Sequence, residues 1–466
     1  MAASKFASNQ FTIFVTLFTV LFLVLFGIFG RYSGETLPNG SPDFGKVSRD
    51  YPLLHDTHGF VLIGLGFLVA FLRRYGFSAL AINLLLVAFV LEWGLIIRGF
   101  LSPEFSQHSA FSISLKDIAK ADYTAASVLI SYGAVVGKLS PIQYVILAFI
   151  ETPLSIVNEF ILFALLGVGD VGGSIVVHLF GAIFGIAVAR VVFKPSQIQS
   201  EHQGSIYHSD IFSFVGTVFL WAFWPSFNSI FAVTAAEQQR AVVTTFLALL
   251  GSTVTTFLFS QLLNKEKRFN FKHIASATLS GGVATGAVAT LVLSPLAALL
   301  VGIVAAIISV LGFNVVTPLL AHKLGVHDTR GVLSLHGLPG IVGALASVIL
   351  LFLTPTEVFG ETIRNIYPLH KTDSKDGRTP AEQALFQLAG LGVTILFALV
   401  TGVITGVILR LKIWRQVREK ENYSDTDFFE VPEDFDFTTR VTSHIERVEL
   451  TEHTERTKLT NNEFTN

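Results

Sequence analysis

Long apolar segments recur along the whole chain, and their length constrains the fold more than any other feature. A helix needs about 20 mostly apolar residues to cross the hydrocarbon core of a bilayer. Only 14% of the residues are charged, whereas a soluble protein carries roughly a quarter. The sequence therefore predicts an all-α polytopic membrane protein with about 12 transmembrane helices. The expected spans lie near residues 11–29, 57–72, 77–97, 121–137, 141–166, 171–192, 210–233, 241–263, 273–293, 296–319, 331–354 and 383–409.

A cleaved signal peptide is an alternative reading of residues 11–29. A single lysine, Lys5, precedes this run, and no convincing small-residue cleavage site follows it. A length of about 19 residues fits a spanning helix better, so we keep it as a span.

Basic residues in the loops predict the orientation, because Lys and Arg next to membrane spans mark the cytoplasmic side. Here they fall on alternate sides of successive spans, so both termini are expected in the cytosol, with the chain in the plasma membrane. The loop at 31–54 then lies outside, where Asn39-Gly40-Ser41 is a candidate N-glycosylation site. The basic residues used are Arg73, Arg74, Lys138, Arg190, Lys194, Lys265, Lys267, Arg268, Lys272, Lys323, Arg330, Arg410, Lys412, Arg415 and Arg418.

Charge and cysteine content exclude several kinds of partner. The net charge is −2, which leaves no basic face for a nucleic acid. The chain has no cysteine, so disulfides, thiolate nucleophiles and thiolate metal sites are excluded. No cofactor is expected.

Two segments share one pattern of polar and small residues. Residues 170–185 and 328–343 both fit D-x2-G-x4-H-x4-I-x-G. The predicted topology starts the first helix outside and the second in the cytosol, which is the arrangement of inverted repeats with a site at the midplane. Eight residues of helix rise about 12 Å, so His178 and His336 should each lie halfway across the membrane and meet there.

An ionisable residue within a membrane helix is costly and by default marks a pathway. The alternative for a single histidine is a packing residue that bonds a neighbouring helix, but a repeated pair favours a shared role. Since a neutral imidazole both donates and accepts, we expect His178 and His336 to hydrogen-bond each other in a narrow pore that favours a small neutral solute. Asp170 and Asp328 stand at helix starts, where capping is their first expected task. Asp170 could also stabilise a cation at the outer mouth.

Other residues leave further alternatives open. Glu92, Glu151 and Glu159 lie in or near apolar spans, and Glu159 fits either a cation-attracting outer vestibule or a paired interface residue. Gly167-Val-Gly-Asp170 matches the G-x-G-D of intramembrane aspartyl proteases, but the chain has no Tyr-Asp dipeptide to supply their second aspartate. Two histidines without a third ligand make a poor zinc site. We therefore expect neither an enzyme nor a metal centre.

Several segments resemble the Rhesus side of the ammonium transporter and Rhesus glycoprotein superfamily. The most specific are Tyr207-His-Ser-Asp, Trp224-Pro-Ser-Phe-Asn-Ser and the LHGLPGIVG run that contains His336. The resemblance covers about residues 55–412 and implies an eleven-helix channel domain there, preceded by an N-terminal span and extracellular loop at 1–54. It also implies a homotrimer whose subunits each form one pore from two inverted repeats. The polar tail at 413–466 is predicted to be cytoplasmic and largely disordered.

The resemblance also assigns individual residues. His178 and His336 match the twin histidines of the pore. Phe227 matches one of two stacked rings of the outer gate, and the other falls at Tyr123; Trp224, three residues before Phe227, is assigned to the same gate. The family usually has Phe at that position, which leaves the polarity of the gate open. Asp170 matches the acidic residue below the outer vestibule, Asp328 is its inner counterpart, and Arg330 stands where relatives often carry an uncharged residue.

The resemblance implies a membrane channel or transporter that recruits ammonium and passes ammonia through an apolar pore. Carbon dioxide is the alternative substrate, and a non-conducting membrane scaffold is the alternative class. The intact pair His178 and His336 argues against a scaffold, since a chain without transport has no need for costly polar groups at the midplane.

Overall fold

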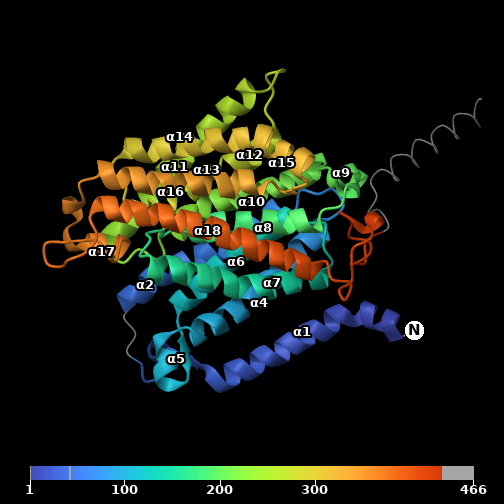
Figure 1. Ribbon diagram of the computed structural model, residues 1–466, viewed down its shortest axis with the longest axis horizontal. Coiled ribbons are helices and arrows are strands. Elements are labelled where there is room, and N and C mark those ends of the chain that lie inside the picture. Colours follow the sequence, from blue (N-terminus) through green and yellow to red (C-terminus); the bar gives the residue numbers. More distant parts are fainter. Residues whose placement is uncertain (1, 41–43, 433–466) are drawn as a thin grey trace, which may run out of the picture.

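The computed structural model of the chain describes residues 2–40 and 44–432. Long helices lie roughly parallel to one another along the long axis of the molecule (Figure 1). Nine helices within the described residues are long and apolar enough to cross a membrane. These are Asn9–Phe29, Gly76–Phe100 (α4), Pro141–Leu165, Ser174–Val192, Tyr207–Phe227 (α10), Ala235–Leu262 (α11), Pro295–Leu324, Leu333–Leu353 and Pro380–Leu409 (α18).

The other three expected spans also form helices, but these are broken or more polar. The span at 57–72 consists of α2 (Phe44–Gly59), a π-helical turn (Phe60–Leu65) and α3 (Gly66–Leu68). The span at 121–137 is α6 (Leu115–Val135), which carries charged residues in its first turns. The Gly-rich span at 273–293 is divided into α12 (Phe271–Ala277) and α13 (Ser280–Thr285). All twelve expected segments are thus helical, and the prediction of an all-α membrane fold is confirmed.

Local sequence signals set where the helices begin. Ser140 and Pro141 start α7 (Pro141–Phe160), and Ser114 starts α6 in a capping box with Asp117. The carboxylate of Asp117 accepts from the Ser114 backbone N–H at 3.0 Å. Such caps satisfy N–H groups that have no partner within the helix.

Small residues let the central helices pack closely. A Cβ added to Gly302 of α14 (Pro295–Leu311) would lie 1.9 Å from the carbonyl oxygen of Ala248 in α11. A Cβ added to Gly402 of α18 would lie 2.7 Å from the carbonyl oxygen of Phe184. Contacts this close are possible only with glycine, and they are typical of helix pairs in membranes.

The two histidine-bearing helices run in opposite directions. In the first helix, Gly181 lies against Ser127 of α6, and Gly185, one turn later, lies against Ser131 of α6. The first helix therefore runs in the same direction as α6. The second helix starts at the other end of α6, where the N–H of Arg330 donates to the Gly133 carbonyl at 3.2 Å. It then runs back and packs on the start of the first histidine helix. The inverted orientation of the repeat is therefore confirmed. The first helix comprises η4 (Ser174–Leu179) and α8 (Phe180–Val192), and the second comprises η7 (Leu333–Gly337) and α16 (Leu338–Leu353).

We name the two ends of the molecule after the predicted topology. The outer end carries Asp170, α5 (Pro103–His108) and α17 (Ile363–Ile366). The inner end carries Asp328 and α9 (Ser196–Gln199), and Figure 1 shows α9 there. The first helix, α1 (Ala2–Phe29), lies along one side of the bundle, and two short parallel strands, β1 (Gly30–Tyr32) and β2 (Phe111–Ile113), join its outer end to the chain beyond α5.

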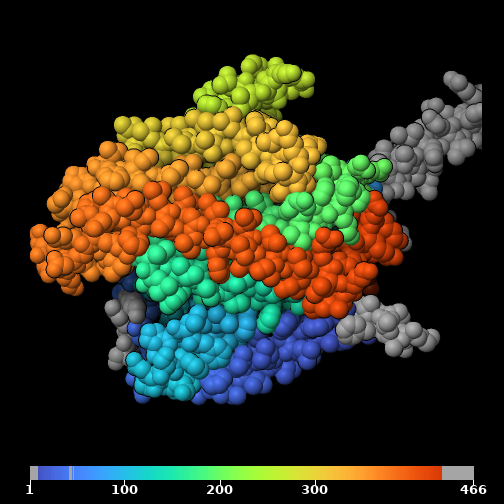
Figure 2. All heavy atoms as spheres, viewed as in Figure 1, coloured from blue at the N-terminus to red at the C-terminus, as the bar shows by residue number. Residues whose placement is uncertain are grey.

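Part of the tail is packed against the inner end, next to α9 (Figure 2). The Tyr423 side chain is fully buried, and its N–H donates to the carbonyl of Gly137 at 2.8 Å. The carboxylate of Asp425 accepts from the N–H groups of Phe77 and Ser78 at the start of α4. The structure thus differs from the expected disorder at residues 421–425, while residues 433–466 lie outside the described part of the chain.

Candidate functional site

The two histidines of the repeat meet in the centre of the bundle. The rings of His178 and His336 lie parallel, with centroids 5.2 Å apart and an interplanar angle of 11°. Both side chains are buried, with 0% and 2% of their surface exposed. Neither ring nitrogen of His178, nor Nδ1 of His336, has a hydrogen-bond partner among the described residues. The expected hydrogen bond between the two rings is therefore wrong, because neither nitrogen of His178 has a partner among the described residues.

Each histidine helix begins on an aspartate, as predicted. Oδ2 of Asp170 accepts from the N–H groups of Ile175 and Val176 at 2.8 and 2.9 Å. Asp328 accepts from three consecutive N–H groups, at residues 331, 332 and 333, over 2.9–3.0 Å. A glycine with positive φ, Gly173 (71°) or Gly331 (83°), lets the chain turn between each aspartate and its helix. The two caps therefore fix where the histidine-bearing turns start.

The two residues expected to form the outer gate, Tyr123 and Phe227, stack on each other near His178. The rings of Tyr123 and Phe227 are 4.1 Å apart and nearly parallel, at 10°. Phe60 stacks on Phe227 at 4.5 Å, so three rings form one stack. The Tyr123 hydroxyl donates to the backbone carbonyls of Phe227 and Val171. Because the hydroxyl bonds backbone carbonyl groups, it adds no free polar group to the stack. Tyr123 presents only the apolar face of its ring there.

Trp224, which the resemblance assigns to the outer gate, also lies next to His178. Its ring centroid is 5.4 Å from that of His178, and it meets Phe60 edge-on at 4.9 Å. Phe227 lies at a similar centroid distance from His178, 5.9 Å. Trp224 and Phe227 therefore both lie next to His178, which in turn lies beside His336.

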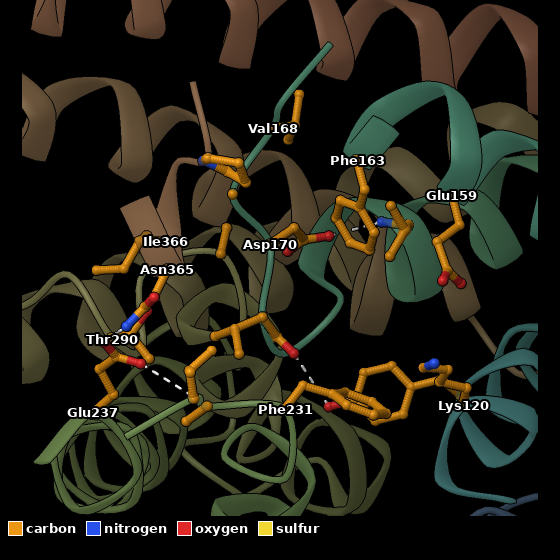
Figure 3. Close-up of a pocket in the computed structure, with 18 residues that line it drawn as sticks. Lys120, Glu159, Phe163, Val168, Asp170, Phe231, Glu237, Thr290, Asn365 and Ile366 are labelled. Atoms are coloured by element: carbon orange, nitrogen blue, oxygen red, sulfur yellow. Dashed lines mark hydrogen bonds between the residues drawn. The ribbon is translucent and has the colours of Figure 1, made fainter. Parts of the chain in front are cut away.

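A cavity of about 300 Å³ opens above the ring stack. Figure 3 shows Asp170 near its centre, with Glu237 on one side and Glu159 and Lys120 on the other. Oδ1 of Asp170 has no hydrogen-bond partner among the described residues. The outer mouth thus brings together three acidic side chains and one lysine.

The environment of Glu159 reduces its effect as an anion. Both of its carboxylate oxygens accept from the Arg98 guanidinium, at 2.8 and 2.6 Å, and Arg98 also donates to Thr124 at 2.8 Å. Glu159 therefore lines the outer cavity and is also paired with Arg98. Glu92 is exposed on α4, and Glu151 is buried between α6 and α7, where it accepts from Ser131 at 2.5 Å.

Sequence reasoning missed Glu237 and the hydrogen bonds from α2 to the residues next to Tyr123 and Phe227. Glu237 closes a capping box with Thr234, and this Thr-x-x-Glu pattern before an apolar run was the available signal. Its other oxygen accepts from Asn365 at 2.8 Å. On α2, His58 bonds Asp122, the residue before Tyr123, at 2.9 Å, and Asp56 accepts from Ser226, the residue before Phe227, at 2.7 Å. One helix thus contacts both gate-bearing helices.

Asn39, the candidate glycosylation site, is exposed in the loop after β1 at the outer end. Its accessibility is compatible with modification.

Comparisons with known proteins give a consistent result. The Ammonium Transporter Family profile matches residues 13–435. Ammonium transporter Rh type B of Oryctolagus cuniculus is 40% identical over 428 residues, covering 90% of this chain and 92% of the relative. The same protein of Homo sapiens is 40% identical over 414 residues, covering 87% and 89%.

Solved structures extend the likeness to the fold. Rh50 of Nitrosomonas europaea, described with the mechanism of conduction by the Rhesus protein family of channels, superposes with a TM-score of 0.72 at 30% identity. The match covers 88% of this chain and 100% of Rh50. Mep2 of Candida albicans has a TM-score of 0.63 at 18% identity, over 82% of this chain and 88% of Mep2, and so supports the fold alone.

Proposed function

The chain belongs to the ammonium transporter family, on its Rh branch, and from this we propose the route by which it conducts ammonia. Ammonium collects in the outer cavity, leaves its proton at the outer mouth near the stack of Tyr123 and Phe227, and crosses as ammonia past His178 and His336. A proton is regained at the inner end, and the concentration gradient drives the flux. The family is one of transporters and channels rather than enzymes.

The observation that carries this proposal is the buried pair of parallel imidazoles. An ammonium ion would lose its hydration beside them, and a charge at that depth is costly. Ammonia is neutral and forms hydrogen bonds as both donor and acceptor, as a neutral imidazole does. Three ring nitrogens of His178 and His336 without partners among the described residues are available to it.

The outer cavity supplies the negative charge that would attract ammonium. Asp170 has one carboxylate oxygen without a partner among the described residues, and Glu237 lines the same cavity. Glu159 contributes less, because Arg98 compensates its charge. An excess of one sign of charge in a cleft raises the local concentration of the opposite ion, and here three carboxylates face one lysine, Lys120.

Assembly and placement are further parts of the proposal. We expect a homotrimer with one pore per subunit, in the plasma membrane, with both termini in the cytosol. Exposed apolar side chains such as Val254 on α11 (71%) and Leu296 on α14 (64%) require a cover of lipid or neighbouring subunits. The division into 1–54, the channel domain at 55–412 and the tail at 413–466 is retained, with 413–432 as a segment that docks on the channel domain.

Flux into proteoliposomes tests the function and separates the two substrates. Vesicles with a trapped pH dye become alkaline when ammonia enters and acidic when carbon dioxide enters. We expect the protein to accelerate the alkaline change over protein-free vesicles and to leave the acidic change unaltered. Acceleration of carbon dioxide alone would reassign the substrate, and acceleration of neither would favour a scaffold.

A further inference from the structure

Arg330 is a buried cation at the inner start of the second histidine helix. Its side chain is 3% exposed. Nε donates to the carbonyl of Leu68, at the end of α3, over 2.9 Å, and Nη2 lies 3.5 Å from the hydroxyl of Ser213 in α10. The guanidinium carbon also lies 5.2 Å from the centre of the Phe71 ring. The side chain therefore joins the loop before η7 to the end of α3 and to α10.

The contacts of Arg330 do not neutralise its charge. Among the described residues they are two oxygens without formal charge and one aromatic ring. Asp328, two residues earlier, uses its carboxylate on three backbone N–H groups. Asp210 attracts Arg330 from a distance, and its carboxylate also accepts from Ser205 at 3.2 Å. Burial lowers the pKa of Arg330 to about 10, which still leaves the guanidinium charged at neutral pH.

Other cations lie around the same helix start. The Lys272 ammonium is 5.3 Å from the centre of the Phe313 ring, and Phe313 lies against Gly331. The Lys138 ammonium donates to the carbonyls of Ala134 and His327. Asp328 attracts all three groups, but burial lowers the pKa of Lys138 to about 7, so Arg330 and Lys272 are the two that stay mainly charged at neutral pH. The outer cavity differs, because three carboxylates and one lysine line it.

Arg330 lies at the inner start of the second histidine helix, six residues before His336, so we place it on the inner part of the pathway. A fixed charge at a constriction with low-dielectric walls repels ions of its own sign more strongly than it would in water. Ammonia has no net charge and is not repelled.

We propose that Arg330 is a charge filter at the inner end of the pathway, which excludes ammonium and other monovalent cations arriving from the inner side while ammonia passes. This rests on the proposed function and adds a residue that determines its selectivity. Together with the acidic outer cavity, the filter gives the pore two chemically different ends. The competing explanation is structural: the bond to Leu68 ties α3 to the loop before η7 and does nothing else.

Variants of the full chain separate the two explanations. Arg330→Met removes the charge and keeps much of the length, Arg330→Gln also keeps an N–H donor for Leu68, and Arg330→Lys keeps the charge. Current is recorded in inside-out patches under voltage clamp, with ammonium at the inner face, and ammonia flux is recorded in vesicles from the same cells. We expect the Met and Gln variants to carry at least about tenfold more ammonium current than the parent, or about 1.4 kcal/mol, and the Lys variant to match the parent.

A second pair of variants keeps Arg330 in place, in case its replacement prevents folding. Ser213→Asp puts a carboxylate next to the guanidinium and compensates the charge, while Ser213→Asn is the uncharged control. We expect added ammonium current with Asp and none with Asn. The filter would be overturned if every folded variant that lacks or compensates the charge kept the ammonia flux of the parent and showed no added ammonium current. An absence of parental ammonia flux would instead overturn the proposed function.

Discussion

The imidazole of His178 lies parallel to that of His336, with 5.2 Å between the centroids, although the two residues belong to helices that run in opposite directions. Each half of the chain thus contributes one ring to the centre of the bundle. Both ring nitrogens of His178 and Nδ1 of His336 have no hydrogen-bond partner among the described residues, which leaves them free to bond a small solute.

The gate is the first feature to test. Replacing both Tyr123 and Phe227 with Ala removes two of three stacked rings, so we expect more water penetration from the outer end and weaker discrimination against ions. Tyr123→Phe is the matched control. It loses only the bonds to two carbonyls, at a cost of about 1 kcal/mol, and its selectivity should equal that of the parent. Water permeability and ion leak in proteoliposomes measure both effects. Unchanged values in the double variant would make the rings ordinary packing residues.

Asp170 combines a capping bond with a carboxylate that faces the outer cavity. Asp170→Asn keeps an oxygen for the N–H groups of Ile175 and Val176 but removes the charge, whereas Asp170→Ala removes both. We expect Ala to lower the free energy of unfolding by about 1 kcal/mol and Asn to change it little. Both should reduce ammonia flux at low ammonium concentration. Full flux with Asn at every concentration would show that Asp170 is only a cap.

The docked part of the tail should matter for stability. Tyr423→Ala empties a buried site against Gly137 and should lower the free energy of unfolding by about 3–5 kcal/mol, measured by denaturation in detergent. Truncation after residue 420 removes the same side chain and should have a similar effect. Truncation after residue 432 is the control and should leave the melting temperature unchanged. Equal stability of both truncated chains would contradict the packing of Tyr423.

Asn39 provides a test of topology. If the loop at 31–54 is extracellular, expression in glycosylating cells should add a glycan that endoglycosidase removes and Asn39→Gln prevents. Pro42 follows the acceptor triplet directly and could lower the occupancy, so a partial shift is expected. A glycan that persists in Asn39→Gln would place the modification elsewhere.

Much of this site could be predicted from the sequence because it is local. The repeat around His178 and His336 has a fixed spacing, and helix geometry converts that spacing into depth in the membrane. The aspartate caps follow from the same argument, since helix starts need acceptors for their free N–H groups. The gate residues Tyr123 and Phe227 came from the resemblance rather than from any physical pattern.

The remaining features depend on contacts between distant residues. Spacing gives the position of the histidines but not the rotation of their rings, which depends on neighbours such as Trp224 and Phe227. The pairing of Glu159 with Arg98 joins α7 to α4, and neither residue alone identifies the other. The polar composition of the tail predicts disorder on average and does not reveal that Tyr423 is buried. Its ring fits against Gly137, where a Cβ atom would clash with it.

The central claim is that ammonia crosses as a neutral molecule beside His178 and His336. His178→Leu replaces a ring without hydrogen-bond partners among the described residues, so the fold should persist. His178→Asp places a negative charge in the lumen. The decisive measurement is ammonia flux and ammonium current in the same proteoliposomes, with the membrane potential clamped. We expect reduced flux or altered selectivity with Leu and an added cation current with Asp. Parental flux, unchanged pH dependence and no added current in both variants would contradict the claim.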